Sequence, residues 1–123
     1  MKKKIDVFEH MGEILNGVKN GVLITSKADD RVNSMTISWG TVGVEWGKPI
    51  FVTFIRENRF TRNLLEKNGE FTVNIPIDDS AKKILGFCGS KSGRDIDKAK
   101  EIGLTYEDPE MISVPGVKEL PLT

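Results

Sequence analysis

Three segments of the chain combine hydrogen-bonding side chains at spacings that could hold a small polar ligand. The first reads NSMTISW, from Asn33 to Trp39. In a strand, Ser34, Thr36 and Ser38 share one face, because successive side chains point to opposite sides. Each hydroxyl can donate or accept a hydrogen bond, which suits a polyhydroxyl chain or a phosphate, and Trp39 could pack beside a planar ring. The pattern alone favours the simpler interpretation, a half-buried strand whose polar residues face water.

The second segment pairs two arginines with the expected start of a helix. It reads RENRFT, from Arg56 to Thr61. The guanidinium group supplies fork-shaped donors, and a helix N-terminus supplies free N–H groups, so an anion could bind here. The alternative, which the segment by itself favours, is a solvated loop with Arg–Glu pairs at the surface.

The third segment places glycines and serines beside basic residues. It reads GSKSGRDIDK, from Gly89 to Lys98, and such a loop could cradle a phosphate. Its spacing differs from GxxxxGK[ST], which excludes that nucleoside-triphosphate loop. The alternative is a mobile turn followed by a capped helix. Cys88 directly precedes this segment. Because the segment contains no histidine that could activate the thiol, we interpret Cys88 as a small core residue.

Composition argues against several other chemistries and partners. The 18 Lys and Arg residues equal the 18 Asp and Glu residues in number, and this zero net charge argues against a nucleic-acid partner. No apolar run approaches the roughly 20 residues that a membrane span needs. One Cys and one His leave no zinc site of the usual type, and we expect no metal. The lone cysteine fits a reducing, cytoplasmic setting, and we expect no signal peptide. Paired-carboxylate, GxSxG and GxGxxG motifs are lacking, so we predict no catalytic side chain and expect a cofactor to supply the chemistry.

Hydrophobic periodicity predicts one mainly β domain with short helices (α+β), over residues 1–123. Short turns between the first strands favour antiparallel pairing. We expect helices over 5–15, from Asn58 or Thr61 to 68, over 78–85 and over 95–102. The expected strands are 22–25, 32–39, a buried strand over 50–55, and 71–75, with a turn over 43–49 and a loop over 86–93. Because about four strands do not close a barrel, we expect the front part of a longer domain, or a sheet that a partner chain completes.

Taken together and in order, these segments resemble the flavin reductase-like, flavoredoxin-type family. The resemblance runs from about Gly21 to about Pro115 and rests on NSMTISWG, WGKPIFVTFIRENRFTRNLLEKNGEFTVNIP, FCGSKSGRDIDK and EIGLTYE. It implies an antiparallel FMN-binding split β-barrel, non-covalently bound FMN and a homodimer. Family members are generally longer, so the resemblance also implies that the C-terminal strands of the barrel are missing here.

The resemblance assigns cofactor-binding residues segment by segment. It places the first segment along the flavin ring and ribityl chain, the second near the phosphate, and the third at polar positions of a later loop, from which Lys98 could reach the flavin. The residues implied are Asn33, Met35, Thr36, Ser38 and Trp39, then Arg59 and Thr61, then Ser92 and Lys98, with Arg56 and Arg94 as secondary candidates.

The implied reaction is hydride transfer from NADH or NADPH to FMN, or electron passage between FMN and a redox protein. Two alternatives stay open at this point. One is a flavoredoxin-like electron carrier that exchanges electrons with a ferredoxin-like partner and has no NAD(P)H activity of its own. The other is a truncated, non-redox binding or structural module.

Overall fold

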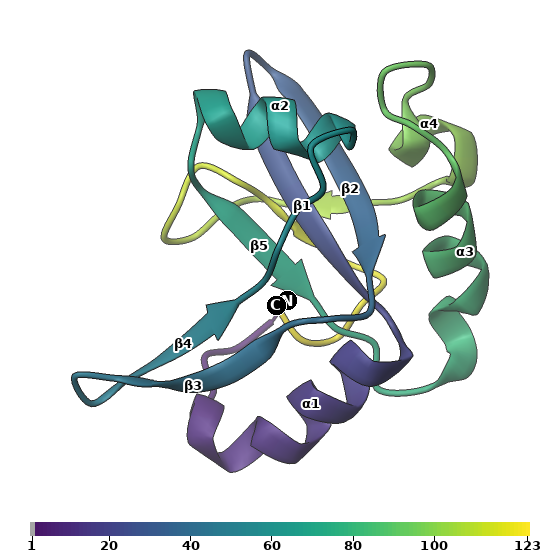
Figure 1. The fold of residues 1–123 in the computed structure, drawn as a ribbon. Coiled ribbons are helices and arrows are strands. Elements are labelled where there is room, and N and C mark those ends of the chain that lie inside the picture. Colours follow the sequence, from purple (N-terminus) through teal and green to yellow (C-terminus); the bar gives the residue numbers. More distant parts are fainter. Residues whose placement is uncertain (1) are drawn as a thin grey trace.

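A three-stranded antiparallel sheet, in the order β2-β1-β5, forms the frame of the computed structural model, which describes residues 2–123 (Figure 1). Its strands are β1 (Val22–Ala28), β2 (Arg31–Ile37) and β5 (Phe71–Asn74). Two further pairs are the hairpin of β3 (Thr41–Glu45) with β4 (Lys48–Val52), and β6 (Tyr106–Glu107) with β7 (Gly116–Val117). The helices are α1 (Met11–Asn20), α2 (Phe60–Lys67), α3 (Lys82–Ser90) and α4 (Lys98–Ile102), with short 3-10 turns at Val7–His10 and Asp79–Ala81. The predicted α+β class and antiparallel pairing are confirmed.

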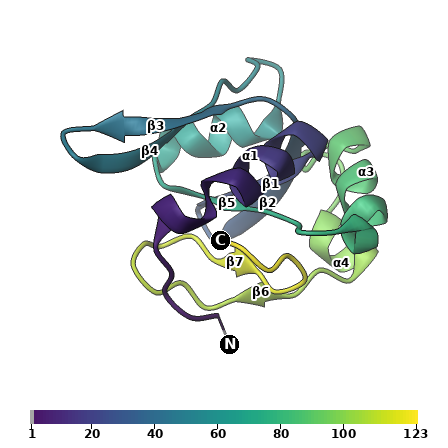
Figure 2. The same ribbon diagram turned by 90° about the horizontal axis from the view of Figure 1, so that it is seen from below.

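The central strand β1 is buried on both faces, which explains the apolar run over its first three residues. Val22, Leu23 and Ile24 are all 0% exposed. Val22 and Ile24 belong to a cluster that α1 and the β3–β4 hairpin cover, whereas Leu23 belongs to a cluster beneath α3 and β7. Figure 2 shows β3–β4 and β6–β7 on opposite sides of the central sheet. The sheet is therefore the middle layer, and β2 is one of its edges.

The structure corrects two expectations about residues 43–55. The predicted turn over 43–49 is wrong, because these residues belong to a hairpin whose two-residue turn is Trp46-Gly47. The strand predicted over 50–55 is present only over 50–52, as the end of β4, and it is not a buried strand. β4 ends at Val52, and Phe51 is its one residue that is not exposed. Phe51 and Ile55 pack against the core, whereas Phe54 is 75% exposed. A two-stranded ribbon at an edge tolerates glycine and proline, so Gly43 in β3 and Pro49 in β4 do not interrupt the strands.

Other boundaries differ more modestly. The helix expected over 5–15 begins with a 3-10 turn and continues through α1 to Asn20, where Gly21 at φ +122° ends it. α3 runs to Ser90, through residues 86–90 of the predicted loop 86–93. α4 begins at Lys98, capped by the side chain of Asp97, rather than at residue 95. Among residues 2–123, every helix is too short or too polar to cross a bilayer.

Candidate binding site

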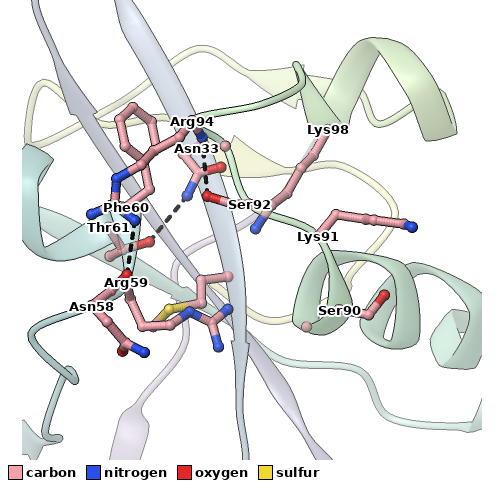
Figure 3. A pocket seen from close by; sticks show the side chains of 13 residues that line it. Asn33, Asn58, Arg59, Phe60, Thr61, Ser90, Lys91, Ser92, Arg94 and Lys98 are labelled. Atoms are coloured by element: carbon pink, nitrogen blue, oxygen red, sulfur yellow. Dashed lines mark hydrogen bonds between the residues drawn. The ribbon is translucent and has the colours of Figure 1, made fainter.

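A cavity of about 210 Å³ lies between β2, the start of α2 and the segment that joins α3 to α4 (Figure 3). The three segments that the sequence singles out therefore meet in space. The lining residues are Asn33 and Met35 from β2, then Asn58, Arg59, Phe60 and Thr61, then Gly89, Ser90, Lys91, Ser92, Gly93, Arg94 and Lys98. Seven of the residues that the resemblance implies line this cavity: Asn33, Met35, Arg59, Thr61, Ser92, Lys98 and the secondary candidate Arg94.

The start of α2 presents backbone donors to the cavity. Arg59 occupies the N-cap position with extended backbone, and no side chain within residues 2–123 caps the helix there. Thr61, in the first turn, is 0% exposed, and its hydroxyl accepts a 3.1 Å hydrogen bond from Nδ2 of Asn33. The first turn carries no acidic residue. The positive end of the helix dipole is thus available to an anion.

Lys98 is a buried cation beside the cavity. Its residue is 3% exposed, and Nζ donates to the backbone oxygens of Ser34 and Cys88, at 2.9 Å each. An ammonium group has three donors, so these two bonds leave one N–H for a ligand. Burial lowers the pKa of Lys98 to about 8, the neighbouring Cys88 acts in the opposite direction, and Arg59 lowers the pKa further.

Arg59 adds a second cation from the opposite wall. Burial, and then the positive charge of Arg56, hold the pKa of Arg59 below its ordinary value. Arg94 and Lys91 also line the cavity, although Figure 3 shows the Lys91 ammonium pointing away from Asn33 and Arg59. Within the described part of the chain, residues 2–123, no Asp or Glu lines this cavity. Its electrostatic character is therefore cationic.

The other residues implied by the resemblance lie outside the cavity. Thr36 lies on β2, and its hydroxyl donates to the backbone oxygen of Leu85 at 2.5 Å. Ser38 is an exposed residue just beyond the end of β2. Trp39 is 42% exposed, donates from Nε1 to the backbone oxygen of Phe54 at 2.9 Å, and lies beneath the guanidinium of Arg56.

The structure also changes the account of the alternating hydroxyls on β2. Ser34 is 0% exposed, and its hydroxyl is shared with Thr25 at 2.8 Å and Tyr106 at 3.0 Å. With Thr36 bonded to Leu85, two of the three hydroxyls are consumed inside the protein. Asn33 and Met35, on the opposite face of the strand, are the β2 residues that reach the cavity. The ladder of free hydroxyls does not form.

Phe60 is a functional candidate that sequence reasoning missed. Two guanidinium groups lie against its ring, with the Cζ atoms of Arg31 and Arg94 at 5.3 and 5.8 Å from the ring centroid. The polar residues of RENRFT carry its signal, and no local pattern links its phenylalanine to an arginine near residue 30. Asn58 and Gly93 complete this wall.

The predicted role of Cys88 agrees with its surroundings. Its side chain is 0% exposed and belongs to the core cluster beneath α3. Burial raises the pKa of the thiol, against the influence of Lys98. Cys88 is therefore a neutral core residue, with no thiolate at neutral pH.

Comparison with known proteins gives concordant results. A family model described as "Flavin reductase like domain" matches residues 15–123. The uncharacterized protein YddH of Escherichia coli K12 is 33% identical over 112 residues, which cover 89% of this chain and 58% of that protein.

Two solved structures are similar as well. The FMN-binding domain of a flavin reductases-like enzyme from Shewanella baltica has a TM-score of 0.75 at 18% identity, covering 88% of this chain and 57% of that one. Flavoredoxin of Desulfovibrio vulgaris has a TM-score of 0.73 at 26% identity, covering 80% and 54%. The chain thus spans only 58%, 57% and 54% of the lengths of these three proteins.

Proposed function

The chain belongs to the flavin reductase-like domain family and has its antiparallel split-barrel fold, and from that membership we propose that it is a flavoprotein oxidoreductase with FMN as its cofactor. The phosphate of FMN would occupy the cavity between Arg59, Ser92 and Lys98. The observation that carries this proposal is the cationic lining, which gathers Arg59, Arg94 and Lys98 beside a helix N-terminus.

The donor set fits a phosphate monoester. Arg59 offers charged donors from one side, and Lys98 offers its third N–H from another. The first turn of α2 adds backbone N–H groups, and Ser92 adds a hydroxyl. Charged donors around a dianion form hydrogen bonds roughly twice as strong as neutral ones. Met35 and the Asn33 amide provide an apolar and a polar contact beside this cluster.

FMN, when bound, supplies the chemistry by accepting and passing on a hydride or single electrons. The residues of this chain bind and orient it, and none is proposed to attack a substrate covalently. We propose NADH or NADPH as the electron donor, in keeping with the reductase family. A flavoredoxin-like carrier, reduced by a ferredoxin-like partner, is the second candidate. The likeness to a flavoredoxin at 26% identity favours it.

We also propose that two copies associate through the β3–β4 hairpin. Five large apolar side chains in and just after this hairpin are 37–93% exposed. They are Val44, Trp46, Ile50, Val52 and Phe54. An apolar surface concentrated on a projecting ribbon is typical of a protein–protein contact.

The test is a titration of the purified protein with FMN, followed by visible absorption and flavin fluorescence, with riboflavin as the matched ligand that lacks the phosphate. We expect FMN to bind at least about tenfold more tightly than riboflavin, because charged hydrogen bonds contribute about 1.5–3 kcal/mol. Equal affinity would contradict the phosphate assignment. A protein that binds neither ligand would refute the flavoprotein proposal.

Anaerobic addition of NADH or NADPH then separates the two functions. Bleaching of the flavin bands without any added protein supports the reductase. Flavin that dithionite reduces but neither nicotinamide bleaches supports the electron carrier.

A further inference from the structure

One wall of the cavity is the segment Lys91–Asp97, which joins α3 to α4 and which we call the strap. Four of its residues line the cavity: Lys91, Ser92, Gly93 and Arg94. The strap belongs to no helix or strand, and its local bonds are turns centred on Ser92, which accepts from the amides of Arg94, Asp95 and Ile96. The opposing walls, β2 and α2, are packed into the sheet.

Arginine side chains fasten the strap from outside. Arg31, at the start of β2, donates from Nη2 to the backbone oxygens of Gly93 and Ile96, the latter at 3.1 Å. Arg94 reaches back from the strap and donates from Nη1 to the backbone oxygen of Asn58 at 2.8 Å. Both guanidinium groups lie against the ring of Phe60, and Figure 3 shows Arg94 beside that ring.

Gly93 allows the strap to close onto this ring. A Cβ atom at position 93 would collide with Oδ1 of Asn33 and with the Phe60 ring, at 2.6 Å from its Cδ2 atom. Even an alanine there would push the strap away from the body. The closed position therefore depends on a backbone approach that only glycine permits.

These fastenings are strong enough to close the strap and weak enough to release it. Arg31 and Arg94 are exposed residues, and hydrogen bonds and cation–π contacts are weaker at exposed sites than in a dry interior. Segments held by few exposed contacts open locally without global unfolding.

We propose that Lys91–Asp97 is a hinged strap over the cavity, that Arg31 is the positioning residue that holds it closed against Phe60, and that its opening lets a phosphate-bearing ligand pass in and out. Arg31 does not line the cavity. Its role is to set the position of Ser92 and Arg94, which do. The nature of the ligand rests on the proposed function, but the opening of the strap does not.

Limited digestion with trypsin tests the opening without any ligand, because Lys91 and Arg94 are cleavage sites within the strap. We expect Arg31→Ala to speed cleavage after these two residues at least about fivefold, with an unchanged urea midpoint. Gly93→Ala should also speed this cleavage, because its Cβ atom pushes the strap away from Phe60. The cleavage rate of Arg31→Lys should lie between those of wild type and Arg31→Ala. Arg62→Ala is the matched control, since Arg62 is an arginine on α2 that pairs with Glu66 at 2.9 Å.

Unchanged cleavage after Lys91 and Arg94 in both Arg31→Ala and Gly93→Ala would overturn the strap. So would faster cleavage at all sites alike together with a lower urea midpoint, because that result describes general destabilisation.

Stopped-flow binding of FMN supplies the second readout. A gate that opens more often raises the association and dissociation rate constants of FMN together, so the dissociation constant changes less than either rate. A rise in the dissociation rate constant alone would overturn the role of the strap in ligand passage. If the wild-type protein bound no FMN, the proposed function and the passage of FMN would both be refuted. The trypsin experiment would still test whether the strap opens.

Discussion

Two cations of the cavity, Arg59 and Lys98, differ in how their charge depends on pH. An arginine keeps its charge at every pH at which a protein folds. Lys98 is buried and its pKa is about 8, so it loses its charge within a range in which the protein can be studied. The two residues therefore allow separate tests of the same phosphate assignment, one by substitution and one by pH.

Replacing Arg59 by alanine should weaken FMN binding and leave riboflavin binding unchanged. We expect the dissociation constant of FMN to rise about 10- to 150-fold, because a charged hydrogen bond of about 1.5–3 kcal/mol is lost. Fluorescence titration of both ligands measures the effect, with Arg62→Ala as the control. An equal loss for FMN and riboflavin would place Arg59 away from the phosphate.

The affinity for FMN should fall as the pH rises through about 8. Below that pH Lys98 carries a proton and a positive charge, and above it the amine is neutral. The phosphate is already a dianion above pH 7, because its second pKa is about 6. We expect the dissociation constant to rise roughly fivefold to tenfold between pH 7 and pH 9 in wild type. Lys98→Gln should show a flat profile, and a flat profile in wild type would contradict the role of Lys98.

At the scale of the elements, hydrophobic periodicity predicted the strands whose apolar residues are buried in the core. The strands over 22–25, 32–39 and 71–75 were predictable because their apolar residues are buried against helices on both faces or on one. The β3–β4 hairpin was not, because Gly43 and Pro49 are turn residues in most contexts, and because most apolar residues of this ribbon are exposed. The periodicity of residues 50–55 could not distinguish a buried strand from an exposed one.

The hairpin turn gives a test of the proposed dimer. Trp46 is 93% exposed and adopts φ +48°, a left-handed conformation that bulky residues avoid. Trp46→Asn removes the aromatic ring and places Asn-Gly, the preferred pair for this turn, so the hairpin should be retained. We expect wild type to sediment as a dimer and this variant as a monomer that still unfolds cooperatively. Met111→Asn, at an 88% exposed residue far along the chain, is the control.

A wild-type protein that is monomeric at roughly tens of micromolar would contradict the proposed dimer. A Trp46→Asn variant that stays dimeric would move the interface elsewhere on the molecule.

At the scale of the whole molecule, the cavity is a product of the tertiary fold. Asn33, Arg59 and Lys98 lie in three separate segments, and each carried a visible local signal of polar or basic residues. Their convergence was available only through the family resemblance. Arg31 and Phe60 carried no such signal, since their partners are more than twenty residues away in sequence. The alternating hydroxyls predicted that Ser34 is exposed, but Ser34 is buried and bonded to Thr25 on the neighbouring strand and to Tyr106, 72 residues away.

Asn74 links the central sheet to the C-terminal segment, and its loss should be felt throughout the molecule. The residue is 0% exposed. Nδ2 donates to Oγ1 of Thr25 at 3.0 Å, and Oδ1 accepts from the amide of Val117 and the hydroxyl of Thr123, also at 3.0 Å. Asn74→Leu keeps the volume but leaves the buried Val117 amide without its partner.

We expect Asn74→Leu to lower the free energy of unfolding by roughly 2–4 kcal/mol, measured from the urea midpoint at constant slope. Asn63→Leu, at an exposed position of α2, is the control and should change stability by less than about 0.5 kcal/mol. Trypsin should also cut faster after Lys118, because β7 and the residues that follow it lose their anchor to β5. Stability within about 0.5 kcal/mol of wild type would show that the other contacts of the C-terminal segment, such as the packing of Val117 and Leu120 and the Ile75–Leu122 bridge, hold it without Asn74.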